Sequence, residues 1–79
     1  MKPEKAFGLA LKAARSSAGI SQEQLALSSD LDRTFISMLE RGQRQPSLTS
    51  ILSIAASLSI PADELIRKTM EAMSEDSET

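Results

Sequence analysis

The sequence predicts an all-α fold in which five helices form one compact bundle. Apolar residues recur at spacings of three and four in separate segments, and residues suited to helix caps stand between those segments. The chain is 41% hydrophobic and has only three glycines and three prolines, which favours a helical module over a disordered chain or a β-sandwich. A chain of 79 residues can bury one modest core, so we expect a single domain over residues 1–73 and an acidic, disordered tail over residues 74–79.

The first helix is expected to begin near Pro3, because proline and Glu4 both suit a first helical turn. Gly19 is expected to end it. The residues predicted to lie on its buried face are Phe7, Ala10, Leu11 and Ala14.

Two short helices follow, over residues 22–28 and 33–41, with a tight turn between them. Ser21 and Asp32 each precede one of these helices and can cap it by accepting a hydrogen bond from a backbone N–H two or three residues further on. Gly42 suits the end of the second helix. The apolar residues expected to hold the pair together are Leu25, Ala26, Leu31, Ile36 and Leu39. This pattern is typical of a helix-turn-helix.

A fourth helix is expected after a loop over residues 43–46, with Ser47 as its cap. Its apolar residues at helical spacing are Leu48, Ile51, Leu52, Ala55 and Leu58. Residues 59–61 then separate it from a fifth helix. The residues expected to face inward on that last helix are Leu65, Ile66, Thr69 and Met70.

The composition excludes several classes of chemistry. The chain has no cysteine and no histidine, which rules out disulfides, thiol nucleophiles, imidazole catalysis and the usual zinc sites. Glu23 and Glu40 have no nucleophile or metal-ligand set beside them, so we expect no catalytic residue, no metal, no cofactor and no enzyme activity. No apolar run resembles a secretion signal or a bilayer span, so we expect a cytoplasmic protein without a membrane partner.

The net charge of −2 is unevenly distributed along the chain. Residues 1–68 hold nine basic and seven acidic residues, a net charge of +2, whereas residues 69–79 hold four acidic residues and no basic one. Phosphate binding depends on local basic density, because each neutralised phosphate releases condensed counterions. The acidic end therefore does not exclude nucleic-acid binding by the rest of the chain.

A further pattern extends over about residues 6–66. Its positions are Phe7-Gly8, Leu11-Lys12, Arg15, Gly19-Ile20-Ser21-Gln22-Glu23, Leu25-Ala26, Ile36-Ser37, Glu40-Arg41-Gly42, Pro46-Ser47-Leu48 and Ala55. In this register the chain resembles the phage-repressor and Cro type of helix-turn-helix family, which includes xenobiotic-response-element-like regulators. Residues 31–37 resemble the recognition segment of restriction–modification controller proteins. The resemblance implies a lambda-repressor-like domain that binds double-stranded DNA. The chain departs from the family pattern at Asp30 and Ser59, where glycine is common.

Helix geometry places Arg33, Thr34 and Ser37 on one face of the helix over residues 33–41, because successive residues are about 100° apart. In this architecture the leading end of that helix enters the major groove. Arginine can donate two hydrogen bonds to guanine, and threonine can contact a thymine methyl group. We therefore expect base contacts from Arg33, with Thr34 and Ser37 as secondary candidates. The alternative is a polar face that is only solvated.

The residues expected to contact the DNA backbone flank this face. The resemblance implies that Gln22 and the backbone N–H groups at the start of its helix bind a phosphate, and helix N-termini favour anions. Arg41, Gln43 and Arg44 follow the recognition helix and are expected to position the protein without specifying a sequence. For Phe35, at the border between core and DNA, core packing is favoured over DNA contact.

The resemblance also implies a structural ion pair between Arg15 and Glu40. This pair is expected to be largely buried and to link the first helix to the end of the third. Its role is architectural, because removing one partner would leave the other charge buried and unpaired.

A domain of this size contacts few base pairs, so specific binding usually requires two copies related by a two-fold axis. In the family, copies often meet at the fifth helix and the segment before it. The residues expected there are Ile60, Leu65, Ile66, Met70 and Met73. For Ile60 and Leu65, we favour the alternative that they complete the core of a single protomer.

The sequence therefore predicts a homodimeric transcriptional regulator that binds a pseudo-palindromic operator through the major groove. Repression by occlusion is the default mechanism, and activation stays open. The alternative is a protein-interaction module, such as an antitoxin or an adaptor. Met70 and Met73, beside the acidic tail, would suit a protein partner that docks on the C-terminal helix.

Overall fold

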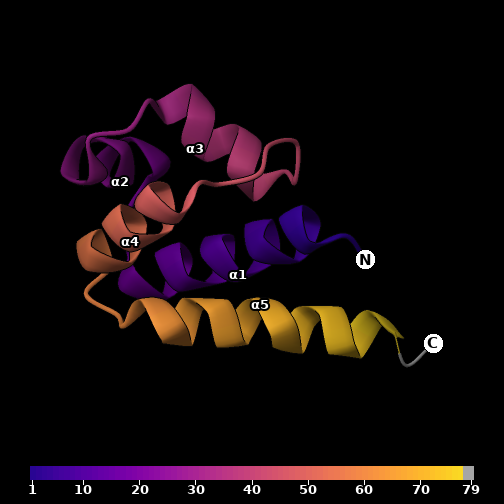
Figure 1. Ribbon diagram of the computed structural model, residues 1–79. Helices are drawn as coiled ribbons and strands as arrows, with labels where there is room; N and C mark the ends of the chain where they lie inside the picture. Colours follow the sequence, from indigo (N-terminus) through magenta and orange to yellow (C-terminus); the bar gives the residue numbers. More distant parts are fainter. Residues whose placement is uncertain (78–79) are drawn as a thin grey trace.

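The chain folds into helices joined by short connections (Figure 1), and the computed structural model describes residues 1–77. In that part of the chain the helices are α1 (Pro3–Ala18), α2 (Gln22–Ser29), α3 (Arg33–Glu40), α4 (Leu48–Ser57) and α5 (Ala62–Ser77). The predicted all-α class and the order of five helices are confirmed. The second and third helices each end within one residue of the position predicted from the sequence.

The long helices α1 and α5 lie side by side and run in opposite directions (Figure 1). On its other side α1 packs against α3, and α2 packs against both α3 and α4. Because α1 lies between them, α3 and α5 occupy opposite sides of the molecule. This arrangement leaves the outer face of α3 uncovered.

The core receives at least one large side chain from every helix. The fully buried large residues are Leu11, Leu25, Ile36, Leu39, Ile54 and Leu65. In α4, the apolar spacing seen in the sequence includes residues outside the core, since Leu48 is 72% and Leu52 is 52% exposed, whereas Ile54 is completely buried. The apolar residues of α4 extend around more of the helix than the core covers, so periodicity alone does not identify the buried half.

Side chains cap three of the helices as predicted. The Ser21 hydroxyl accepts a hydrogen bond of 3.0 Å from the backbone N–H of Gln24, whose side-chain oxygen accepts one of 2.8 Å from the backbone N–H of Ser21. Asp32 accepts from the backbone N–H of Thr34 at 2.8 Å, and Ser47 accepts from that of Ser50 at 3.0 Å. These bonds satisfy N–H groups that have no partner within their own helix.

The two departures from the family pattern both lie in the left-handed backbone region. Asp30 ends α2 with φ 58°, and Ser59 follows α4 with φ 59°. Aspartate tolerates this conformation better than most residues, as predicted. Serine tolerates it less well, because its Cβ atom meets a steric cost at positive φ. The turn after α4 therefore holds a residue in a conformation that favours glycine.

The structure differs from the prediction at the end of the chain. Helix α5 continues to Ser77, although residues 74–79 were expected to be a disordered tail, and residues 78–79 lie outside the described part. Ala72, Met73 and Glu75 are good helix formers, which is consistent with the additional turn. Within residues 1–77, no single helix is long and apolar enough to cross a membrane, and α4 and α5 meet that test only together, as a pair bent by 108°.

Replacing Ser59 with glycine is expected to stabilise the fold by about 0.5–1 kcal/mol, because glycine adopts positive φ without steric cost. For a domain of this size the midpoint of thermal unfolding should rise by about 2–8 °C. The matched control is Ser57→Gly, which places the same residue at a helical position of α4 and should lower stability. Equal effects of the two substitutions would contradict the explanation.

Candidate nucleic-acid interface

Helix α3 presents its polar side away from the core. Ile36 and Leu39 are completely buried, while Arg33 and Thr34 are exposed at the first turn and Ser37 is partly exposed one turn later. The structure therefore brings the three predicted base-contacting residues onto one accessible face. Met38, which the sequence analysis did not select, is partly exposed four residues after Thr34 and borders the same face.

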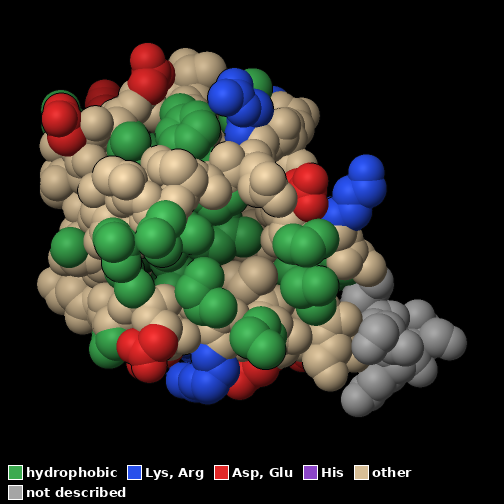
Figure 2. Space-filling view, viewed as in Figure 1, with side chains coloured by type: hydrophobic (Ala, Val, Ile, Leu, Met, Phe, Trp, Pro, Cys, Tyr) green, Lys and Arg blue, Asp and Glu red, His purple; other side chains and the backbone are tan. Residues whose placement is uncertain are grey.

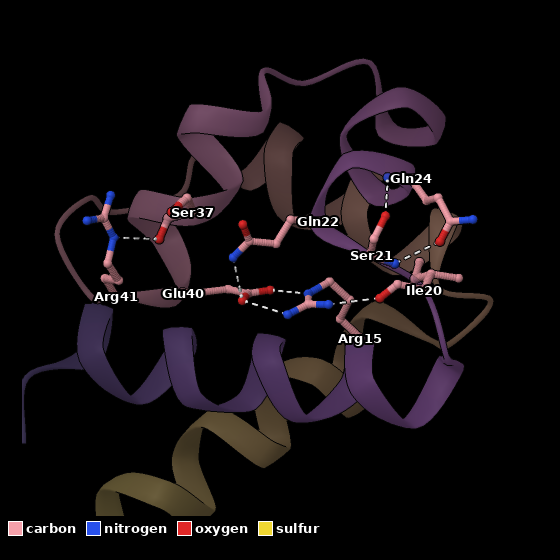
Figure 3. A network of polar contacts seen from close by, with 8 residues as sticks. All are labelled: Arg15, Ile20, Ser21, Gln22, Gln24, Ser37, Glu40 and Arg41. Atoms are coloured by element: carbon pink, nitrogen blue, oxygen red, sulfur yellow. Dashed lines mark hydrogen bonds and ion pairs between the residues drawn. The ribbon is translucent and has the colours of Figure 1, made fainter.

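A network of hydrogen bonds joins α1, α2 and α3 behind this face (Figure 3). The Arg15 guanidinium donates to both carboxylate oxygens of Glu40, from Nε at 2.6 Å and from Nη2 at 3.1 Å. It also donates from Nη1 to the backbone oxygen of Ile20 at 2.8 Å. The predicted ion pair is present, and it connects the middle of the fold to the turn that precedes α2.

The ion pair is largely shielded from solvent, with the Arg15 side chain 14% and the Glu40 side chain 3% exposed. The hydrogen bonds to Glu40 raise the pKa of the Arg15 guanidinium, and this effect exceeds the opposing effect of burial. Arg15 is therefore charged at every pH at which the protein would be studied. No buried side-chain nitrogen or oxygen among the described residues lacks a hydrogen-bond partner, so this polar network is fully satisfied.

Gln22 belongs to the same network, which the sequence did not predict. Its side-chain nitrogen donates to Glu40 Oε1 at 3.0 Å, and the side chain is partly buried (Figure 3). The expected role was phosphate binding through this amide and the neighbouring backbone N–H groups. In the structure the side chain connects the start of α2 to the end of α3, which leaves the backbone N–H groups of that first turn as the outward donors.

A glycine allows α1 and α3 to approach closely. A Cβ atom at Gly8 would lie 2.8 Å from the backbone oxygen of Glu40, closer than such atoms approach in proteins. A side chain at this position would therefore separate the two helices at the point where the ion pair joins them. Close contact and ion pairing together fix the orientation of α3.

The predicted backbone-contacting residues after α3 are also accessible. Arg41, Gln43 and Arg44 are exposed, and Arg41 Nε donates to the backbone oxygen of Ser37 at 3.3 Å (Figure 3). The Arg44 guanidinium lies over the ring of Phe35, 5.7 Å from its centre, which is a cation–π contact. Phe35 itself is partly buried against the core, so the favoured core alternative is correct for part of its ring.

A polar hollow lies between the beginnings of α2 and α3. Its volume is about 430 Å³, and its lining residues are Arg15, Ser21, Gln22, Glu23 and Arg33. Arg33, the leading base-contacting candidate, therefore lies close to the first turn of α2. Among the described residues, no group of three or more acidic side chains is placed to hold a metal ion.

The residues proposed for contact between copies divide into two sets. Leu65 is completely buried and Ile60 is partly buried against the core, so the alternative of a core role is correct, and Leu65 cannot touch a partner. Ile66 and Met70 are 38% and 63% exposed on α5, and Met73 is partly exposed. Leu48 and Leu52 are also exposed, on α4, and hydrophobic side chains gather over α4 and α5 in Figure 2.

Comparison with known proteins gives one consistent answer. A family profile described as helix-turn-helix matches residues 11–65. The chain is 43% identical over 60 residues to control protein C.MunI from a Mycoplasma species, covering 75% of this chain and 81% of the relative. It is 41% identical over 61 residues to control protein C.BamHI from Bacillus amyloliquefaciens, covering 76% and 75%. The crystal structure of the restriction–modification controller protein C.AhdI from Aeromonas hydrophila is similar with a TM-score of 0.77 and 45% identity, covering 78% of this chain and 94% of that one.

Replacing Arg15 with methionine is expected to destabilise the protein by about 3–5 kcal/mol, because Glu40 would be left charged and buried without its partner. The measurement is the free energy of unfolding from urea titration. The matched control is Arg67→Met, which breaks the exposed pair between Arg67 and Glu71 and should change stability by at most about 0.5 kcal/mol. Similar small losses in both variants would show that the buried pair does not stabilise the fold.

Proposed function

This chain belongs to the helix-turn-helix family of DNA-binding regulators, and on that premise we propose that it binds a pseudo-palindromic operator as a homodimer and regulates transcription. The observation that carries the proposal is the accessible polar face of α3, with Arg33 and Thr34 at its leading end. A helix of this kind fits the major groove, where the donors and acceptors of all four base pairs can be distinguished.

Arg33 is the main base-contacting residue in this proposal. It is exposed, and its guanidinium can donate two parallel hydrogen bonds to guanine. Thr34 and Ser37 supply shorter polar groups on the same face and suit contacts with neighbouring base edges. The buried ion pair supports this assignment, because it holds α3 in one orientation before DNA is present.

Contacts with the DNA backbone come from both ends of the face. The first-turn backbone N–H groups of α2 form one group of donors, which the bond between Gln22 and Glu40 holds in place. Arg41, Gln43 and Arg44 form the other, and Phe35 supports the Arg44 guanidinium. These contacts fix the position of the protein on the duplex and contribute most of the salt dependence of binding.

The second copy is assigned to the apolar face of α4 and α5. One α3 helix contacts too few base pairs for high specificity, and two copies double the contacted sequence. The residues that form this face are Leu48, Leu52, Ile66, Met70 and Met73. Large apolar side chains exposed together on a small protein indicate a surface that is covered in the functional state.

The relatives suggest the class of genes that is regulated. C.MunI and C.BamHI are control proteins, and C.AhdI is a controller of a restriction–modification system. We propose the same class of target for this chain, with repression by occlusion where the operator overlaps a promoter. A protein-interaction module is the alternative, and it would dock a partner on the apolar face of α5.

Selection of bound duplexes from a random DNA pool tests the proposal, which expects enrichment of an inverted repeat. Arg33→Ala should relax the preference at one base position of each half-site, at a cost of about 1–3 kcal/mol. Arg44→Ala should instead weaken binding to all sequences alike, because phosphate contacts carry no sequence information. The absence of an enriched repeat for the unmodified protein would favour the interaction module, and a loss of base preference in Arg44→Ala would contradict the assignment of roles.

Ile66→Asp is expected to convert the dimer to a monomer, since a carboxylate would be buried within the contact between copies. Sedimentation velocity at several concentrations measures the change in mass. Leu27 offers the matched control, because it is 79% exposed on α2 and Leu27→Asp should leave the mass of a dimer unchanged. Dissociation by Leu27→Asp rather than by Ile66→Asp would place the interface elsewhere.

A further inference from the structure

The first helix reaches the loop that follows α3. Gly42 is the second residue of this loop, with φ 73°, and a Cβ atom built on it would lie 3.0 Å from the Cα of Lys5 and 3.2 Å from its Cβ. The loop therefore rests directly on α1 at this residue. Lys5 is exposed, and its stem passes beside the loop that carries Arg41 and Arg44.

The edge formed by Lys5, Arg41 and Arg44 is positively charged. Residues 41–47 contain two arginines and no acidic residue. Glu40 precedes them but is buried and paired with Arg15, so its charge is compensated within the protein. The neighbour of Lys5 in sequence, Glu4, lines a hollow between α5 and the far end of this loop, together with Gln45, Pro46 and Ile66. Within residues 1–77, no ion pair engages the Lys5 ammonium group.

We propose that Lys5 is an additional DNA-backbone contact, which extends the phosphate-binding edge from the α3–α4 loop onto α1. This inference rests on the proposed DNA binding and adds a residue outside the helix-turn-helix itself. A lysine on a four-carbon stem presents a compact charge that neutralises a phosphate without selecting a base. Arg41 and Arg44 place the sugar-phosphate chain on this edge, and Lys5 lies next along it.

A purely structural role for Lys5 makes different predictions. Its side-chain stem lies beside Gly42, just after the carboxyl end of α3, where a positive charge would stabilise the helix dipole. Loss of that interaction would lower the midpoint of thermal unfolding and leave the salt dependence of DNA binding unchanged. A phosphate contact changes the salt dependence and leaves the preferred sequence unchanged.

The test compares Lys5→Gln with Lys68→Gln, which removes the same charge from α5 on the other side of the molecule. Binding of the full chain to a selected operator and to an unrelated duplex is measured between 50 and about 200 mM salt. For Lys5→Gln, we expect the slope of log affinity against log salt to fall by about 0.9 for each protomer bound. Both duplexes should be weakened by the same factor, whereas Lys5→Arg and Lys68→Gln should retain the original slope.

An unchanged slope in Lys5→Gln, with the unmodified protein binding its operator, would overturn the proposal and leave DNA recognition by α3 intact. An equal loss of slope in Lys68→Gln would also overturn it, because the effect would then reflect net charge alone. Failure of the unmodified protein to bind any duplex would overturn the proposed function itself, and with it the role of Lys5.

Discussion

The buried ion pair between Arg15 and Glu40 is the interaction on which the rest of the structure depends. It joins α1 to the last residue of α3, and through Ile20 and Gln22 it also fixes the approach to α2. Gly8 allows the two helices to come close enough for this contact. A buried charge is costly without its partner, so the pair strongly disfavours any arrangement in which α3 rotates or slides. The exposed face of α3 is therefore positioned by groups that are themselves largely or partly buried.

Local features of the fold could be predicted from the sequence, because caps and turns depend on neighbouring residues. Ser21, Asp32 and Ser47 mark their helices correctly, and the outward position of Arg33 follows from helix geometry. Contacts between distant segments were harder to predict. The ion pair was expected only through family resemblance. The hydrogen bond between Gln22 and Glu40 and the cation–π contact between Arg44 and Phe35 depend on side-chain orientations that sequence spacing does not determine. The exposure of Leu48 and Leu52 on α4 could not be predicted either, since periodicity does not reveal which neighbours cover a helix.

The net charge of −2 is due to the carboxyl-terminal end of the chain, where residues 69–79 hold four acidic residues and no basic one. Arg33, Arg41 and Arg44 occur on and after α3, beside exposed Asp30 and Asp32 at its start, whereas the carboxyl-terminal half of α5 carries Glu71 and Glu75 and no basic residue. Because α1 separates these two helices, the acidic end faces away from the candidate interface. A polyanion bound to α3 would therefore lie away from this acidic end, which would otherwise repel it.

The position of α1 between α3 and α5 has a consequence for the spacing of half-sites. In a dimer formed through α4 and α5, each recognition helix is connected to the two-fold axis by packed helices and not by a flexible linker. The separation and twist between the two helices are then set by the protein. Inserting one base pair at the centre of an operator would rotate one half-site by about a tenth of a turn relative to the other. A rigid protein can follow that change only by twisting the duplex, so the central spacer should constrain recognition even where no side chain reaches it.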